Sequence, residues 1–133
     1  MKKFLAALAV AGTVATSVVV LAPTASAAGC VTGWMSTVGT STQGAAVFTK
    51  GSSPCHDVNI SWSYNPQGAY SGYAGAYRRP GGSWNVGSRG YVQMDNGYHD
   101  INNPYYALIT DLNVGAEFTV MSRNYGDQVN VTY

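Results

Sequence analysis

The feature that most constrains the fold is a strict alternation of polar and apolar side chains over residues 57–64, within segment 55–64. Val58, Ile60, Trp62 and Tyr64 alternate there with polar residues. A period of two places the apolar side chains on one face of a β-strand and the polar ones on the other. The sequence therefore predicts a strand in this segment with one buried face and one solvated face.

Shorter segments of the same kind follow, bounded by Gly, Pro, Asn and Asp, and no helical spacing of apolar residues occurs after residue 28. The expected strands are 70–78, 83–86, 90–94, 105–111, 116–122 and 128–133, with weaker candidates at 31–38 and 45–49. Turns are expected at 65–68, 79–82 and 95–97. The predicted fold is all-β, a small antiparallel sandwich of two sheets, with a small β-barrel as the alternative.

The first 27 residues have the composition of a signal peptide. Lys2 and Lys3 precede an apolar run over 4–21, and Ala25-Ser26-Ala27 supplies the small residues that signal peptidase accepts. A membrane anchor is the alternative, because 18 residues is near the lower limit for crossing a bilayer. The small-residue site favours cleavage after Ala27, which leaves residues 28–133 as one secreted, extracellular domain with no membrane association.

The charges of this domain narrow the choice of partner. Residues 28–133 carry five Lys or Arg and six Asp or Glu, so the +1 of the whole chain becomes −1. No basic stripe is present, and a nucleic-acid partner is not expected.

Cys30 and Cys55 both lie in the exported part and are expected to form a single disulfide. The bond would close a loop of about 25 residues, which stabilises a fold by about 3 kcal/mol. In a plain meander of strands 31–38, 45–49 and 55–64, the two cysteines would be about 9.5 Å apart, whereas bridged Cα atoms lie within about 7 Å. We therefore expect the first and third of these strands to contact each other directly, side by side or across the sandwich.

Segments 58–62, 73–78 and 109–120 resemble the B, C and E-to-F segments of fibronectin type III domains. The resemblance implies a sandwich in which Trp62 packs in the core and the run from Leu112 turns the corner into the next strand, with Phe118 where that family has a tyrosine. From the alternation, Trp62, Phe118 and one of Tyr73 and Tyr77 are expected in the core.

Candidate chemistry rests on two His-Asp dipeptides, His56-Asp57 and His99-Asp100. Neighbours on a strand point to opposite faces, so neither dipeptide forms an acid/base pair by itself. Surface or turn roles are therefore expected for them, with no catalytic residue, no metal site and no cofactor. A pair of distant carboxylates, as in glycosidases, stays open as an alternative.

Aromatic residues are the most informative part of the composition, since 15 rings occur in the 106 residues after residue 27. Tyr, Trp and Arg mixed with Ser, Gly and Asn are typical of protein-binding surfaces. The expected function is a secreted, non-enzymatic protein that engages an extracellular protein through aromatic-rich loops, either as an inhibitor of a secreted enzyme or as an adaptor. A carbohydrate or cell-wall binding module is the alternative, and a small secreted hydrolase is third. The candidate binding residues are Tyr64, Tyr70, Arg78, Arg79, Trp84, Tyr98 and Tyr105.

Overall fold

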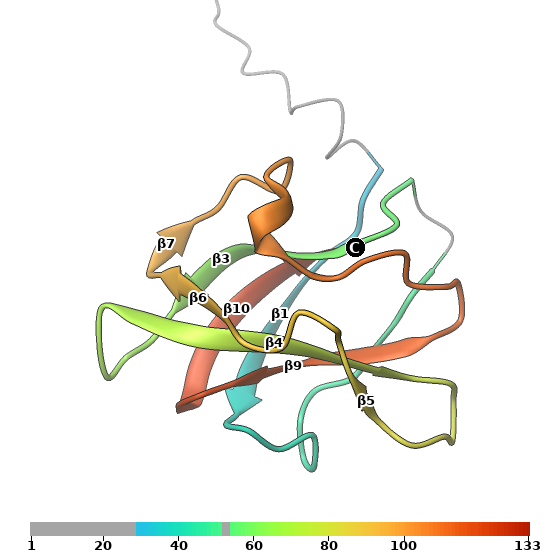
Figure 1. The fold of residues 1–133 in the computed structure, drawn as a ribbon, viewed down its shortest axis with the longest axis horizontal. Helices are drawn as coiled ribbons and strands as arrows, with labels where there is room; N and C mark the ends of the chain where they lie inside the picture. The colour runs from blue at the N-terminus through green and yellow to red at the C-terminus, as the bar shows by residue number, and fades with distance from the viewer. Residues whose placement is uncertain (1–28, 52–53) are drawn as a thin grey trace, which may run out of the picture.

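A computed structural model describes residues 29–51 and 54–133, so the expected signal peptide lies outside the described residues. The described chain forms two antiparallel β-sheets packed against each other (Figure 1), which confirms the predicted all-β sandwich with one disulfide. The sheets do not close into a barrel. No helix among the described residues has the length and apolar character needed to cross a membrane.

The described part of the chain contains ten strands and one short 3-10 helix. The elements are β1 (Thr32–Val38), β2 (Phe48–Thr49), β3 (Val58–Tyr64), β4 (Tyr70–Arg78), β5 (Asn85–Val86), β6 (Val92–Asp95), β7 (Gly97–Tyr98), η1 (Pro104–Tyr106), β8 (Ala107–Ile109), β9 (Glu117–Ser122) and β10 (Tyr125–Thr132). Each predicted strand overlaps one of these strands, and most of the observed ones are shorter because turns take up the ends. β10 begins three residues before the predicted 128–133, β6 ends one residue after the predicted 90–94, and β7 was not predicted.

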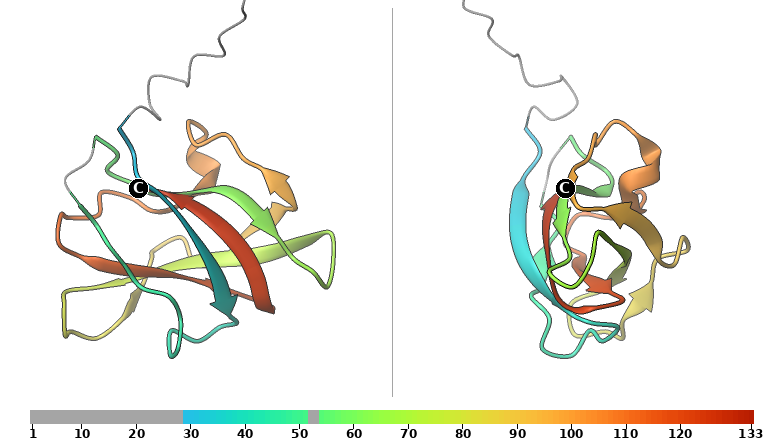
Figure 2. Two further views of the ribbon diagram at one scale, coloured as in Figure 1. Left: turned by 180° about the vertical axis from the view of Figure 1, so that it is seen from behind. Right: turned by 90° about the vertical axis from the view of Figure 1, so that its left-hand side faces the viewer.

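One sheet, which we call the first sheet, has the order β1-β10-β3-β7, with β8 also paired to β3. The second sheet has the order β2-β9-β4-β5, with β6 also paired to β4. In the view from behind in Figure 2, β1 and β10 lie in front, so this view looks onto the outer side of the first sheet.

The disulfide between Cys30 and Cys55 is present, with the two Cα atoms 5.5 Å apart. We expected the strands at 31–38 and 55–64 to contact each other directly. That prediction is wrong, because β10 lies between β1 and β3. Both cysteines precede their strands, and Tyr133 pairs with Val31 at the end of β10. The two loops therefore meet beyond the end of β10, where no strand separates them.

A β-bulge in β3 overturns the expected alternation. Ile60 pairs with Val131 and Trp62 pairs with Asn130, so Ser61 is an extra residue on β3. A bulge changes which face the following side chains occupy. Val58 and Ile60 are fully buried, but Ser63 rather than Trp62 continues the buried side. The prediction that Trp62 lies in the core, which the fibronectin type III resemblance also implied, is therefore wrong.

The core between the sheets is built from aliphatic residues of both sheets and a few rings. Phe118 and Tyr73 are fully buried, as predicted for Phe118 and for one of the two tyrosines of β4, while Tyr77 is exposed. A second, smaller cluster of Ala74, Ala76 and Met121 lies apart from this core, with Trp84 and Tyr91 packed against it.

The turn expected at 95–97 connects the two sheets rather than two neighbouring strands of one sheet. β6 pairs with β4 in the second sheet, and β7 pairs with β3 in the first. The chain therefore crosses from one sheet to the other at Asn96, and Gly97 there has a φ of 123°, which favours glycine. This crossing brings Tyr98 to the edge of the first sheet.

Candidate functional site

A row of residues crosses the outer face of the first sheet. Trp34 on β1 is paired with Asn130 on β10, Asn130 with Trp62 on β3, and Trp62 with Tyr98 on β7. Directly paired residues of antiparallel strands point to the same face. Tyr64 follows Trp62 on the same strand and is paired with Gln128. We call Trp34, Trp62, Tyr64 and Tyr98 the aromatic platform.

Three rings of the platform lie close together, and Tyr98 lies beside them as the strand partner of Trp62. The Trp34 and Trp62 centroids lie 4.9 Å apart with their planes tilted by 59°, and Tyr64 stacks near Trp62 at 6.0 Å. Trp34 is 59% exposed, Tyr64 42% and Tyr98 90%, while Trp62 is half-buried among them. Trp62 thus supports the platform, and the other three rings offer their faces to a ligand.

The Asn130 side chain lies at the centre of this row. Its two neighbours in the row are Trp34 and Trp62, whose rings meet although their strands are separated by β10. The Asn130 Oδ1 atom is buried and has no hydrogen-bond partner among the described residues. An unpaired buried acceptor destabilises a fold, so the arrangement of the two indoles beside this amide lowers the stability of the domain.

The outer face of the first sheet carries no charge. Strands β1, β10, β3 and β7 are all within the described chain, and their one charged residue is Asp127, whose side chain is fully buried. The polar residues beside the platform are amides and hydroxyls: Ser36 and Gln128 are exposed, and Asn130 is partly so. The platform is therefore an apolar surface rimmed by neutral hydrogen-bonding groups.

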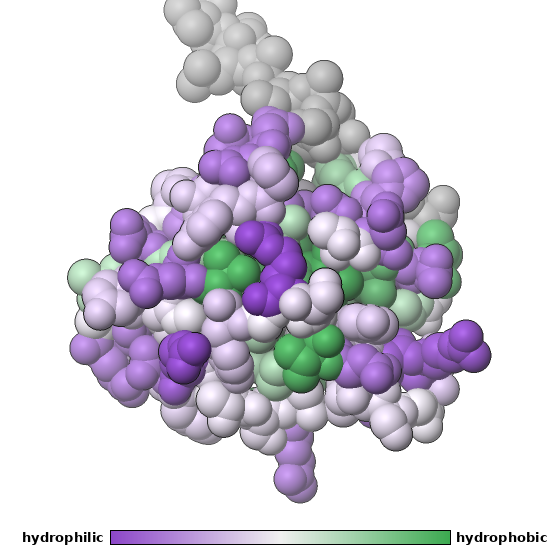
Figure 3. All heavy atoms as spheres, in the orientation of Figure 1, coloured by the Kyte–Doolittle hydropathy of each residue, from purple (hydrophilic) through white to green (hydrophobic). Residues whose placement is uncertain are grey.

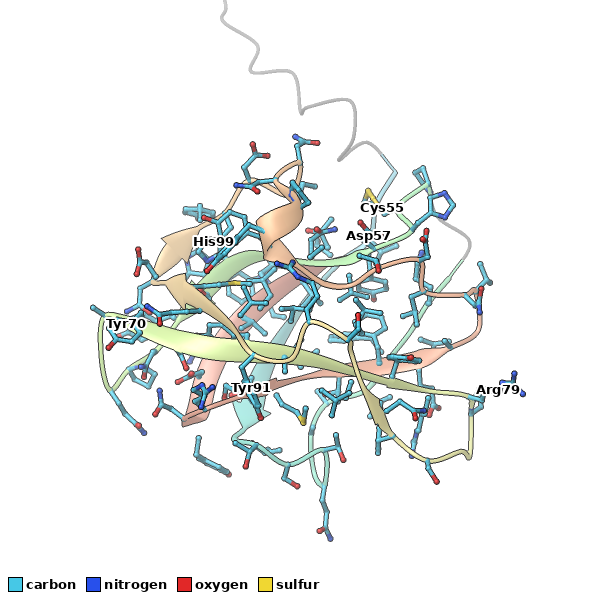
Figure 4. All side chains as sticks on the ribbon, in the orientation of Figure 1. Cys55, Asp57, Tyr70, Arg79, Tyr91 and His99 are labelled. Carbon is cyan, nitrogen blue, oxygen red and sulfur yellow. A yellow bond between two sulfur atoms is a disulfide. The ribbon has the colours of Figure 1, made fainter. Side chains whose placement is uncertain are left out.

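The predicted binding residues do not form one surface. Tyr64 and Tyr98 belong to the platform, but they lie on the sheet face rather than on loops. Tyr70, at the start of β4 in the second sheet, is 56% exposed. Figure 4 shows Tyr70 and Arg79 at opposite ends of β4.

Several of the other predicted residues have partners within the domain. The Arg78 Nε atom lies 2.6 Å from Glu117 Oε2, and its guanidinium covers the Trp84 ring at 4.4 Å. The Tyr105 hydroxyl donates to the Gln93 carbonyl. Arg78, Trp84 and Tyr105 therefore make contacts within the domain, which reduces the side-chain surface that each offers to a partner.

Sequence reasoning missed Trp34 and misplaced Trp62. Trp34 alternates with the buried Met35 in β1, so its outward direction follows from the strand period once β1 is recognised. For Trp62 the sequence contains no local signal, because nothing distinguishes Ser61 from Ser63 as the residue that forms the bulge.

The two His-Asp dipeptides lie in different parts of the fold. His99 stacks on Tyr106, and its Nε2 atom lies 2.8 Å from Ser63 Oγ. His56 follows Cys55, and Asp57 accepts a hydrogen bond from the Asp111 backbone; Figure 4 shows His99 well separated from Cys55 and Asp57. Within residues 29–51 and 54–133, no group of three His, Cys, Asp or Glu side chains is placed to hold a metal ion.

The Ser63–His99 pair is the nearest approach to a catalytic arrangement. Ser63 is fully buried, and its hydroxyl also donates to the Asp95 carbonyl. A nucleophile must reach its substrate, and this hydroxyl has no exposed surface. Burial lowers the pKa of His99 below its usual 6.5, and the Asp95 carboxylate offsets part of that effect. The pair therefore ties β7 to β3 and does not support the hydrolase alternative.

A second buried polar group lies nearby on the inner face. Burial raises the pKa of the Asp127 carboxyl, and the Ser71 and Tyr73 hydroxyls lower it by a smaller amount. Burial and the Asp127 charge raise the pKa of Tyr73 in turn. Neither Asp127 oxygen has a full hydrogen bond from a described residue. This group is enclosed between the sheets and is separate from the platform.

Comparison with known proteins finds no matching family model, no matching curated protein and no matching solved structure.

Proposed function

We propose that this chain is a secreted, non-enzymatic carbohydrate-binding domain, and that the aromatic platform stacks on the sugar rings of a neutral glycan. The observation that carries the proposal is the row of Trp34, Trp62 and Tyr98 across an uncharged sheet face. Pyranose rings have apolar C–H faces, and the faces of aromatic rings carry partial negative charge that attracts such C–H groups.

The neutral surroundings of the platform support a glycan over a protein. Arginine is enriched at protein interfaces, and charged residues commonly rim them. The four strands of this face offer amides and hydroxyls instead, with Gln128 and Ser36 next to the rings. Neutral sugars present hydroxyls that can donate to and accept from such groups, so neither side has to give up the hydration of a charge.

The extent of the row indicates an oligosaccharide rather than a monosaccharide. From β1 to β7 the row spans three strand spacings, about 14 Å. Tyr98 at one end and Trp34 at the other are the most exposed rings of the platform. A glycan that lies across the strands would contact both, whereas a single sugar would contact one.

The protein-binding hypothesis has less support from the geometry. Its predicted residues are divided between the two sheets, and the Trp84 ring is covered by the guanidinium of Arg78. No loop surface in the described chain gathers them.

The test is retention of the secreted protein on insoluble cellulose, on chitin and on purified bacterial cell wall. We expect retention on at least one, loss of most of it in Trp34→Ala and Tyr98→Ala, and no loss in Tyr70→Ala. Tyr70 is the matched control because it is an exposed strand tyrosine on the other sheet. Equal retention of all three variants, or recovery of a protein partner and no polysaccharide from culture supernatant, would refute the proposal.

Export is tested separately by intact mass. The secreted protein should lack residues 1–27 and two thiol hydrogens, because the signal peptide is removed and Cys30 and Cys55 are joined. Retention of residues 1–27 in the mature protein would favour the membrane anchor instead.

A further inference from the structure

A second surface, away from the platform, has a different chemistry. A hollow of about 830 Å³ lies between segment 77–89, which runs from the end of β4 past β5, and segment 108–116, which joins β8 to β9. Its volume is in the range of ligand sites in proteins. In Figure 3, apolar green atoms are visible between polar side chains in this part of the face.

The positive charges of the domain are concentrated at this hollow. Three of its five Lys and Arg residues line it: Arg78, Arg79 and Arg89. Asp111 is the one acidic residue among the described residues that line it. Glu117 neutralises Arg78, whereas neither Arg79 nor Arg89 has an acidic partner within residues 29–51 and 54–133. The hollow therefore has a net positive charge in a domain whose overall charge is −1.

Arg89 is held in place before any ligand arrives. Its Nη1 atom donates to the carbonyls of Pro104, Tyr105 and Ala107 at 2.5 to 2.9 Å. These contacts orient the guanidinium without cancelling its charge, because carbonyls are neutral. Arg79 is exposed and extends outward from the end of β4 (Figure 4). One fixed and one free guanidinium thus lie at the edge of the hollow.

The inner part of the hollow is apolar. Leu108, Ile109 and Leu112 form its floor and are almost fully buried, whereas Val114, which also lines it, is 67% exposed. Inorganic anions gain nothing from such a surface, whereas an organic anion with a hydrocarbon side chain gains from both parts.

We propose that this hollow binds an acidic peptide, with carboxylates on Arg79 and Arg89 and an apolar side chain against Val114, over the floor formed by Leu108, Ile109 and Leu112. The planar fork of a guanidinium matches a carboxylate, and the apolar floor selects peptides over small inorganic anions. The site lies at the second sheet and its loops, whereas the aromatic platform occupies the outer face of the first, so the two are independent.

The test is a titration of the secreted, disulfide-bonded, isotope-labelled protein followed by amide NMR. The probe is the peptide acetyl-Asp-Leu-Glu-Leu with a free carboxyl terminus, and the neutral control is acetyl-Asn-Leu-Gln-Leu-amide. We expect the acidic peptide to shift amides in segments 79–89 and 108–116 and to leave Trp34 and Trp62 unchanged. Added salt should weaken binding, since exposed charges are screened.

Arginine variants identify the charge that matters. Arg79→Gln should weaken binding of the acidic peptide about tenfold, about 1.4 kcal/mol. Arg123→Gln is the matched control, because Arg123 is an exposed arginine that stacks on Tyr91 and does not line this hollow. Arg89 is left unchanged, since its three carbonyl contacts support the fold.

Three results would overturn the proposal. One is the absence of shifts in both segments at millimolar acidic peptide. Another is binding of the neutral peptide or of inorganic phosphate as tight as that of the acidic peptide. The third is an equal loss in Arg79→Gln and Arg123→Gln, which would indicate attraction to net charge rather than to this hollow.

Discussion

Replacing Asn130 by leucine tests whether the centre of the platform is strained, as its unpaired amide oxygen indicates. Leucine has the same branching at Cγ as asparagine and removes the buried Oδ1 acceptor that lacks a partner among the described residues. The backbone carbonyl of Asn130, which accepts a hydrogen bond from the Ser61 hydroxyl, is kept. We therefore expect the variant to be more stable than the wild type.

The size of the effect follows from the burial of this atom. An unsatisfied buried polar group costs about 1–3 kcal/mol, and the substitution removes that cost. For a domain of about 100 residues, each kcal/mol shifts the melting temperature by about 4–8 °C. Gln128→Leu is the matched control, because Gln128 lies two residues earlier on the same face and is exposed. Its change should stay within about 0.5 kcal/mol.

The assay is thermal unfolding followed by circular dichroism, combined with retention on the polysaccharide that the wild type binds. Asn130→Leu should raise the melting temperature and keep retention, because Oδ1 is covered by the protein and is not open to a sugar hydroxyl. A lower melting temperature in Asn130→Leu than in Gln128→Leu would show that the amide oxygen is satisfied, and the reasoning would fail.

Three further predictions concern stability. Replacing Cys30 and Cys55 together by serine should cost about 3 kcal/mol in urea unfolding, because the bond closes a loop with a sequence separation of 25 residues; an unchanged midpoint would contradict the assignment. Gly75→Ala should cost about 1–3 kcal/mol, because its Cβ would lie 2.5 Å from Ile109 Cγ1 and 3.1 Å from Leu108 Cβ. Gly51→Ala, whose Cβ would meet no described atom within 4 Å, is the control and should change little. The third prediction concerns His99, whose pKa is lower in the folded state than in the unfolded chain, so the unfolded state takes up the proton first. The stability that neutral His99 contributes is complete above about pH 6.5 and is lost as the pH falls from there through the folded pKa. His99→Gln should therefore reduce the change in the free energy of unfolding between pH 7.5 and 5. An unchanged pH dependence in the variant would assign it to other groups.

Local pattern predicted much of the fold because strand period and turn chemistry act over a few residues. The segments that became β3, β4 and β9 were located from alternation alone, and the pairing of Cys30 with Cys55 followed from their number. The partners of the strands were not accessible in this way. β10 pairs with both β1 and β3, and the disulfide loops pass beyond its end, so an argument from neighbouring strands placed β1 against β3 wrongly.

The candidate sites, too, were predictable from the sequence only in part. The sequence by itself determined that the rings are numerous, that charges are few and that the chain has the alternation of a two-sheet sandwich. Only the tertiary structure decided which rings face solvent, because the bulge at Ser61 turns Trp62 and Tyr64 outward and the crossing at Asn96 brings Tyr98 beside them. It also placed three arginines of segment 77–89 around one hollow, opposite segment 108–116. The physical reason is that register and sheet order are set by packing between residues distant in sequence, and a shift of one residue moves a side chain from the core to the surface.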